Sequence, residues 1–110
     1  MKLSEWLRAN RRPQAFGALT DGERACAVAQ IFEEAFGVPT GRVGVRRESQ
    51  LIRWVLQTYR IKIPPRTETC GKCAMPFRLP DGLSGYIIHL NDVHFAGKAV
   101  IAEALEAIGL

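Results

Sequence analysis

The sequence contains no uncharged apolar run that approaches the roughly 18 residues needed to cross a membrane. Its opening segment, MKLSEWLRANRRPQAF, lacks the apolar stretch of a signal peptide. Internal repeats and low-complexity stretches are also missing. We therefore expect a protein that neither spans a membrane nor leaves the cell by the signal-peptide route, and that works in the cytoplasm.

Cysteine is scarce, with three residues in the chain, Cys26, Cys70 and Cys73. An odd number of cysteines is poorly suited to a disulfide framework and is more typical of a metal site or of free thiols in a reducing compartment. The sequence thus favours metal ligation over disulfide bonding.

The length of 110 residues predicts a single domain, because one hydrophobic core usually needs about 100 to 200 residues. A hydrophobic content of 47% with 24% charged residues is typical of globular proteins and excludes a disordered composition. Within residues 1–110 we expect a helical part (1–66), a part built on a hairpin and a candidate zinc site (67–95), and a closing helix (96–110).

The positive charge is concentrated in the middle of the chain. Residues 42–78 contain nine Lys and Arg residues and two Glu residues, whereas residues 81–110 contain four acids and one Lys. A basic region of this kind attracts acidic macromolecules, either nucleic acid or an acidic protein surface, although it can also serve only solubility.

Helical spacing of apolar residues predicts three helices in the first part of the chain. The first begins near Leu3 and ends before Pro13, because proline disfavours helix at and before its position. The second is predicted from Thr20 to Phe36, with Thr20 and Glu23 as a capping box. The third is predicted over residues 49–60.

The second part of the chain predicts strands followed by a helix. Residues 77–79 and 85–90 are the predicted strands of a hairpin, joined by a turn at Pro80-Asp81-Gly82, and residues 97–108 form the closing helix. The fold class is α+β, mostly helical, with a CxxC turn at the hairpin. We predict one shared core that includes Val28, Ile31, Phe32, Leu51, Val55, Ile87, Ile101 and Leu105.

Four residues have the spacing of a zinc site. Cys70-Gly71-Lys72-Cys73 is followed after fifteen residues by His89 and after four more by His94. Two thiolates and two imidazoles at these intervals can bind zinc tetrahedrally, and four protein ligands make such a site structural. Lys72 inside the turn favours the thiolate form.

Other interpretations of these residues remain open. The CxxC could be redox-active, although thioredoxin-like motifs lie at a strand-to-helix junction. His89 and His94 could be ordinary structural histidines. Cys26 could replace one histidine as a ligand, or it could pack beneath the first helix.

The third predicted helix has a polar stripe. Steps of four, three, four and three residues align the candidate partner-binding residues Arg46, Gln50, Arg53, Gln57 and Arg60. Arginine and glutamine can contact phosphates and base edges, whereas the alternative role is that of a solvated face.

The segment from Ile87 to His94, IIHLNDVH, followed by IAEAL from Ile101, resembles small uncharacterised proteins of bacterial phages and prophages. Their carboxyl-terminal signature reads approximately HLNDxH, an aromatic residue, Ser or Thr, and then IAxWL. Residues 24–29 resemble a degenerate copy of their CALGA segment. Ala96 and Gly97 depart from the pattern and weaken the helix start. The resemblance implies a phage-related origin, no established activity, and a role for Asn91 and Asp92 in the turn into the last helix.

The sequence supports three functional hypotheses. The first is a non-enzymatic accessory protein of phage type that binds nucleic acid, or a host protein that handles nucleic acid or defends the cell. The second is a small zinc-dependent hydrolase in which one of the four residues is not a ligand and Asp92 or Glu68 acts as base. The third is a self-associating protein whose exposed aromatic residues, such as Trp6 or Trp54, form the contact.

Overall fold

The chain is described over residues 2–40 and 48–110 by a computed structural model, in which it has a mixed α+β fold. The described residues form five α-helices, one π-helical turn and two small antiparallel sheets. In chain order the elements are α1 (Leu3–Ala9), β1 (Thr20–Asp21), β2 (Arg24–Ala25), α2 (Ala27–Phe36), α3 (Glu48–Thr58), β3 (Arg66–Thr69), β4 (Pro76–Leu79), α4 (Leu83–Ile88), the π-helical turn η2 (His89–Val93) and α5 (Lys98–Ala107).

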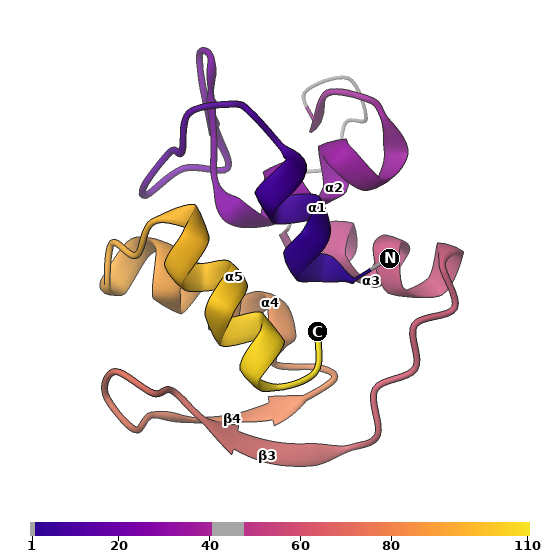
Figure 1. Cartoon of the computed structure of the whole chain (residues 1–110), viewed down its shortest axis with the longest axis vertical. Helices are drawn as coiled ribbons and strands as arrows, with labels where there is room; N and C mark the ends of the chain where they lie inside the picture. The colour runs from indigo at the N-terminus through magenta and orange to yellow at the C-terminus, as the bar shows by residue number, and fades with distance from the viewer. Residues whose placement is uncertain (1, 41–47) are drawn as a thin grey trace.

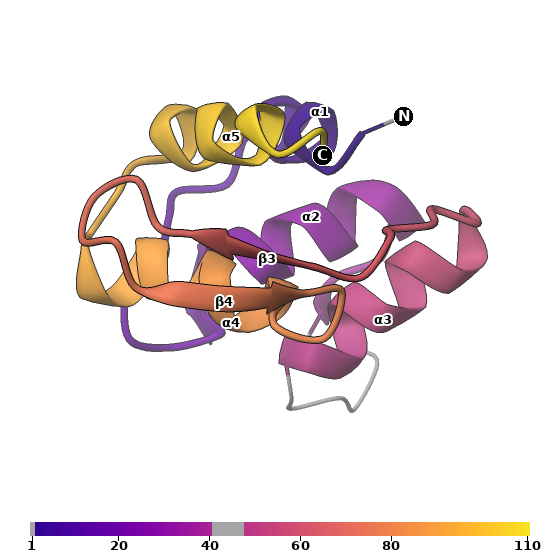
Figure 2. The ribbon, with the colours of Figure 1, turned by 90° about the horizontal axis from the view of Figure 1, so that it is seen from below.

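Helix α2 lies at the centre of the molecule and packs against α1, α3 and α4. Figure 2 shows α1 and α5 side by side on one side of α2, with α3 and α4 on the other. The two ends of the chain meet where the Ser4 N–H donates to the Leu110 carbonyl at 3.1 Å (Figure 1). This arrangement buries almost the whole circumference of α2.

The predicted core is confirmed. All eight residues expected to share it belong to one buried cluster, to which every α-helix and strand β4 contribute. Phe32 contacts Phe36 and Trp54, with ring centroids 4.8 and 6.2 Å apart. The apolar stripes of the sequence therefore identify the buried faces of α2, α3 and α5 correctly.

The predicted start of the second helix is wrong. Thr20 and Glu23 do not cap a helix; they belong to the β1–β2 hairpin, in which Gly22 turns the chain at a φ of 58°. The helix begins at Ala27, with Cys26 as its N-cap residue and no side-chain hydrogen bond from that residue. Its end is as predicted, with Gly37 in the left-handed conformation.

The predicted hairpin is also wrong in its pairing. Strand β4 pairs with β3, which precedes the CxxC turn, so that Arg66 lies opposite Leu79 and Thr69 opposite Pro76. Residues 85–90, predicted as a strand, lie instead in α4 (Leu83–Ile88) and at the start of η2. The physical reason is that Leu83, Tyr86, Ile87 and Leu90 are all buried at helical spacing, which outweighs the strand preference of Tyr-Ile-Ile.

The turn from β4 to α4 is tight. A Cβ atom at Gly82 would lie 2.6 Å from the Arg78 carbonyl oxygen, so only glycine fits without moving the backbone. The Gly82 N–H donates to that same carbonyl. This turn sets the direction in which α4 leaves the hairpin.

The closing helix is confirmed as α5, which begins after Gly97 and ends before Ile108. Trp6, predicted as an exposed aromatic residue, is buried at 4% exposure because it packs on Tyr59 beneath α1, whereas Trp54 is 40% exposed as predicted. No helix in the described ranges combines the length and the apolar character needed to cross a membrane.

Replacing Phe32 with Ala should destabilise the protein by about 3 to 5 kcal/mol, because Phe32 is only 2% exposed at the centre of the core. Chemical denaturation followed by circular dichroism measures this loss. The exposed Val100 offers a control, since Val100→Ala should change the free energy of unfolding by no more than about 0.5 kcal/mol. A loss below about 1 kcal/mol for Phe32→Ala would contradict the position of α2 in the core.

Candidate metal centre

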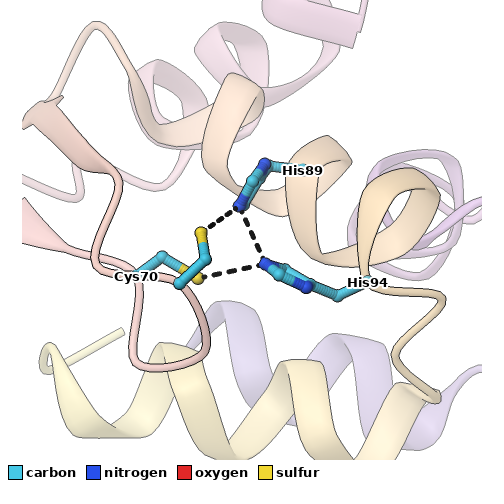
Figure 3. A group of neighbouring side chains, drawn as sticks. Cys70, His89 and His94 are labelled. Atoms are coloured by element: carbon cyan, nitrogen blue, oxygen red, sulfur yellow. Dashed lines mark hydrogen bonds between the residues drawn. The ribbon is translucent and has the colours of Figure 1, made fainter.

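The four residues with zinc-ligand spacing meet at one end of the molecule. Cys70 and Cys73 lie in the loop between β3 and β4, whereas His89 and His94 lie at the two ends of η2. One ligand atom from each residue lies within 4.8 Å of all the others. Figure 3 shows the two imidazoles pointing toward the cysteine loop. The cluster is therefore close enough to hold a metal ion.

The individual distances agree with a tetrahedral site. His89 Nε2 lies 3.0 Å from His94 Nε2, Cys73 Sγ lies 3.2 Å from His89 Nε2, and Cys70 Sγ lies 3.6 Å from His94 Nε2. Around a tetrahedral zinc ion, nitrogens are separated by about 3.4 Å and a sulfur lies about 3.6 Å from a nitrogen. These three separations lie within about 0.4 Å of the tetrahedral values, so the donor atoms are close enough to share one cation.

The π-helical turn is what brings the two histidines together. Residues five apart project about 140° from each other around an α-helix, so His89 and His94 would diverge. In η2 the His94 N–H instead donates to the His89 carbonyl at 3.2 Å, five residues back, and widens the turn. The rings then meet edge to face, with centroids 4.6 Å apart.

The cysteine loop is folded to stabilise a thiolate. Burial of Cys70 opposes ionisation, but the backbone N–H groups of Lys72 and Cys73, the Cys73 side chain and the charge of Lys72 together outweigh it and lower the pKa of the Cys70 thiol. The loop closes through bonds from Cys70 N–H to Met75 O and from Ala74 N–H to Cys70 O. Ala74 takes a φ of 59° to make this closure.

The surroundings of His89 favour its neutral ring. Burial, and then the charge of His94, lowers the pKa of His89. A neutral imidazole is the form that binds a metal ion. Behind the site, Phe77 of β4 stacks on Tyr86 of α4, with ring centroids 3.9 Å apart, and fastens the hairpin to the helix that leads to His89.

Asn91 makes more contacts than the role in a turn that the sequence suggested for it would need. Its side chain is buried inside η2, where Nδ2 donates to Ala15 O at 2.8 Å and Oδ1 accepts from the amide of Gln14 at 2.7 Å. Oδ1 also accepts from the Ala27 N–H at 3.2 Å, at the start of α2. Asn91 therefore links η2, the segment after α1, and α2.

Asp92 acts beside it, because its Oδ1 accepts from the Gly17 N–H at 2.9 Å. The expectation that Asn91 and Asp92 serve the turn before the last helix agrees with their place in η2, but their partners include residues far away in sequence. The Asn-Asp pair within the histidine segment was the only sequence signal for this role.

Cys26 lies apart from the cluster. It is 4% exposed in the core at the N-cap of α2, where burial raises the pKa of its thiol to about 11. Of the two roles left open by the sequence, the structure thus places it in packing. The CxxC lies in a hairpin loop and not at a strand-to-helix junction, which is the location typical of thioredoxin-like motifs.

The predicted partner-binding stripe lies on α3 and just beyond it. Gln50, Arg53, Gln57 and Arg60 are all exposed, and we call these four residues the α3 face. Arg46, the first residue of the predicted stripe, lies outside the described residues.

Comparisons with known proteins give no relative. No protein-family model matches the chain, and no curated protein or solved structure is similar enough to count as a match.

Replacing Asn91 with Ala should destabilise the protein by roughly 2 to 4 kcal/mol, because the buried Ala15 carbonyl and Ala27 N–H lose their partner together and the Gln14 amide keeps only its bond to the Ala96 carbonyl. Thermal and urea unfolding measure the loss. Val93→Ala, an exposed change in the same turn, is the control and should be close to neutral. Equal stability of the two variants would mean that Asn91 does not hold these elements together.

Proposed function

We propose that this protein is a small non-enzymatic accessory protein of phage type, stabilised by one structural zinc ion, that binds an acidic macromolecule through the α3 face. The observation that carries the zinc part is the convergence of two sulfur and two nitrogen donors within 4.8 Å. Cys70, Cys73, His89 and His94 would be the ligands.

Several features support a structural role for the ion. A two-stranded hairpin is marginally stable by itself. The loop that joins β3 to β4 lies on the side of the molecule opposite α3 (Figures 1 and 2). A zinc ion bound by four protein ligands would cross-link this loop to η2 and leave no position open for a substrate.

The groups that a hydrolase would need are engaged elsewhere. Asp92 accepts hydrogen bonds from Gly17 and Asn91, and Glu68 pairs with Arg66 at 2.9 Å. Both carboxylates already have partners within the fold, which supports a binding protein over the zinc-dependent hydrolase.

Charge and exposure support the choice of the α3 face. Arg53 and Arg60 are exposed, and neither forms an ion pair within residues 2–40 and 48–110. Arg8, Arg12 and Arg66, by contrast, are paired with Glu106, Glu33 and Glu68. Because Arg53 and Arg60 have no carboxylate partner in the described part of the chain, their charge is available to an acidic partner.

The purified protein should contain about one zinc ion per chain, measured by elemental analysis under reducing conditions. Cys73→Ser should lower the zinc content and speed amide hydrogen exchange in β3, β4 and η2 more than in α1–α3, because the core helices have their own apolar contacts.

Met75→Ser is the matched control, since Met75 is exposed in the same loop and supplies no ligand atom. It should leave the zinc content unchanged. A metal-free wild-type protein, or one whose stability a chelator leaves unchanged, would rule out the structural zinc.

Reversing charge on the α3 face should weaken binding to acidic polymers. The probes are a 20-base-pair DNA duplex, a 20-nucleotide single strand and a 20-residue polyglutamate. For the probe that the wild-type protein binds best, we expect the double variant Arg53→Glu with Arg60→Glu to lower the affinity at least tenfold. Fluorescence anisotropy at 50 and 200 mM salt measures this, and binding should weaken as salt rises.

Arg11→Glu with Arg24→Glu carries the same charge change on exposed residues elsewhere and should retain most of the affinity. The proposal fails if the folded α3 variant binds as tightly as the wild type, or if the wild type binds none of the probes. Size-exclusion chromatography of the same samples tests self-association, and a stable dimer without probe binding would favour the third hypothesis.

A further inference from the structure

A pocket of about 460 Å³ lies beside the α3 face. Its walls come from α3, from residues 60–63 that follow it, and from the turn between β4 and α4. The volume lies within the range of sites that enclose a small ligand or inserted side chains, roughly 300 to 1,000 Å³. We call it the α3 pocket.

The α3 pocket has an aliphatic interior. Its apolar lining consists of Ile52, Leu56, Ile61, Ile63 and Pro80, and none of the lining residues that the structure describes is aromatic. Four of these five residues are only partly buried, so the chain itself does not cover them fully. An apolar group that entered the pocket would therefore remove aliphatic surface from water.

The rim of the α3 pocket is basic. Arg53, Arg60 and Lys62 line it together with one carboxylate, that of Asp81. All four side chains are exposed, and in the described part of the chain none of the four forms an ion pair. The excess of positive charge suits a ligand that carries carboxylates or phosphates next to its apolar group.

Arg60 is held in a strained backbone conformation at this rim. Its φ is 53°, and the Ile61 N–H donates to the Leu56 carbonyl at 2.9 Å, which is the hydrogen bond of a Schellman helix end. Glycine is the usual residue at this position, because a side chain in the left-handed region is unfavourable. The chain thus keeps an arginine where stability alone favours glycine, and strain of this kind is concentrated at functional sites.

Given the proposed function, on which this step rests, we infer that the α3 pocket binds an acidic segment of a partner protein, and that this segment inserts a large apolar side chain between α3 and the β4–α4 turn. Single-stranded nucleic acid binds by stacking its bases on aromatic side chains, which the described lining does not offer. Duplex DNA is bound mainly through phosphates and has no apolar side chain to insert. The aliphatic interior therefore favours protein as the partner.

A displayed library of random 12-residue peptides, selected on the zinc-loaded full-length protein, tests this inference. Enriched peptides should combine two or more Asp or Glu residues with a Leu, Ile, Met or Phe. Replacing that apolar residue of a synthetic enriched peptide with Ser should weaken its binding at least tenfold at unchanged charge, as measured by fluorescence anisotropy.

Two variants separate insertion into the pocket from attraction to its charge. Ser49→Trp fills the pocket from an exposed lining residue and keeps every cation, so it should weaken peptide binding at least tenfold. Thr58→Trp is the matched control, because Thr58 is exposed on the same helix outside the pocket, and its affinity should stay within about twofold of the wild type.

Arg60→Gly tests the strained arginine. Removing the side chain from the left-handed position should raise the melting temperature by roughly 2 to 5 °C. The same variant should weaken peptide binding at least threefold, because a cation of the rim is lost. An Arg60→Gly variant that binds the peptide as tightly as the wild type would contradict a binding role for the strained arginine.

The outcomes distinguish this inference from the proposed function. Peptides that bind Ser49→Trp and the wild type equally, but fail to bind the double variant Arg53→Glu with Arg60→Glu, would contradict insertion into the α3 pocket. Such a result would still support binding through the α3 face. Enrichment without an acidic and apolar consensus would overturn the inference, and so would single-stranded DNA binding that Ser49→Trp abolishes. Peptide binding unaffected by the charge-reversed variant would overturn both.

Discussion

The buried side chain of Asn91 is the interaction on which the rest of the structure depends. Its amide joins the start of α2, the segment after α1, and the turn that carries both histidines. Because a buried backbone group without a partner is costly, each of these segments is held where Asn91 can reach it. The position of η2, and through it the geometry of the metal centre, depends on one polar side chain inside an apolar core.

Helix α4 connects the candidate metal centre and the α3 pocket. Its first turn contributes Ser84 to the α3 pocket, and η2, which holds His89, continues directly from its end. On its buried side, Tyr86 stacks on Phe77 of the hairpin. The metal centre and the pocket are therefore attached to opposite ends of one short, well-packed segment, and the hairpin lies alongside it.

The apolar faces of the helices were predictable from the sequence, whereas the strand pairing was not. The stripes of α2, α3 and α5 repeat over about three turns, so their buried residues stand out. The stretch from Leu83 to Leu90 is short and rich in residues that suit either a strand or a buried helix. Only the requirement to bury Leu83, Tyr86, Ile87 and Leu90 on one side decides for a helix.

The sequence by itself determined the α+β class, the core residues and the four candidate metal ligands, because apolar periodicity and ligand spacing are local properties. The tertiary structure alone decided where α2 begins, since its N-terminal N–H at Ala27 is bonded by Asn91, 64 residues further on. It alone also decided that β4 pairs with β3, that a π-helical turn aligns His89 with His94, and that a pocket lies beside Arg53 and Arg60. Each of these depends on contacts between separate segments, and no local pattern encodes which segment becomes the partner.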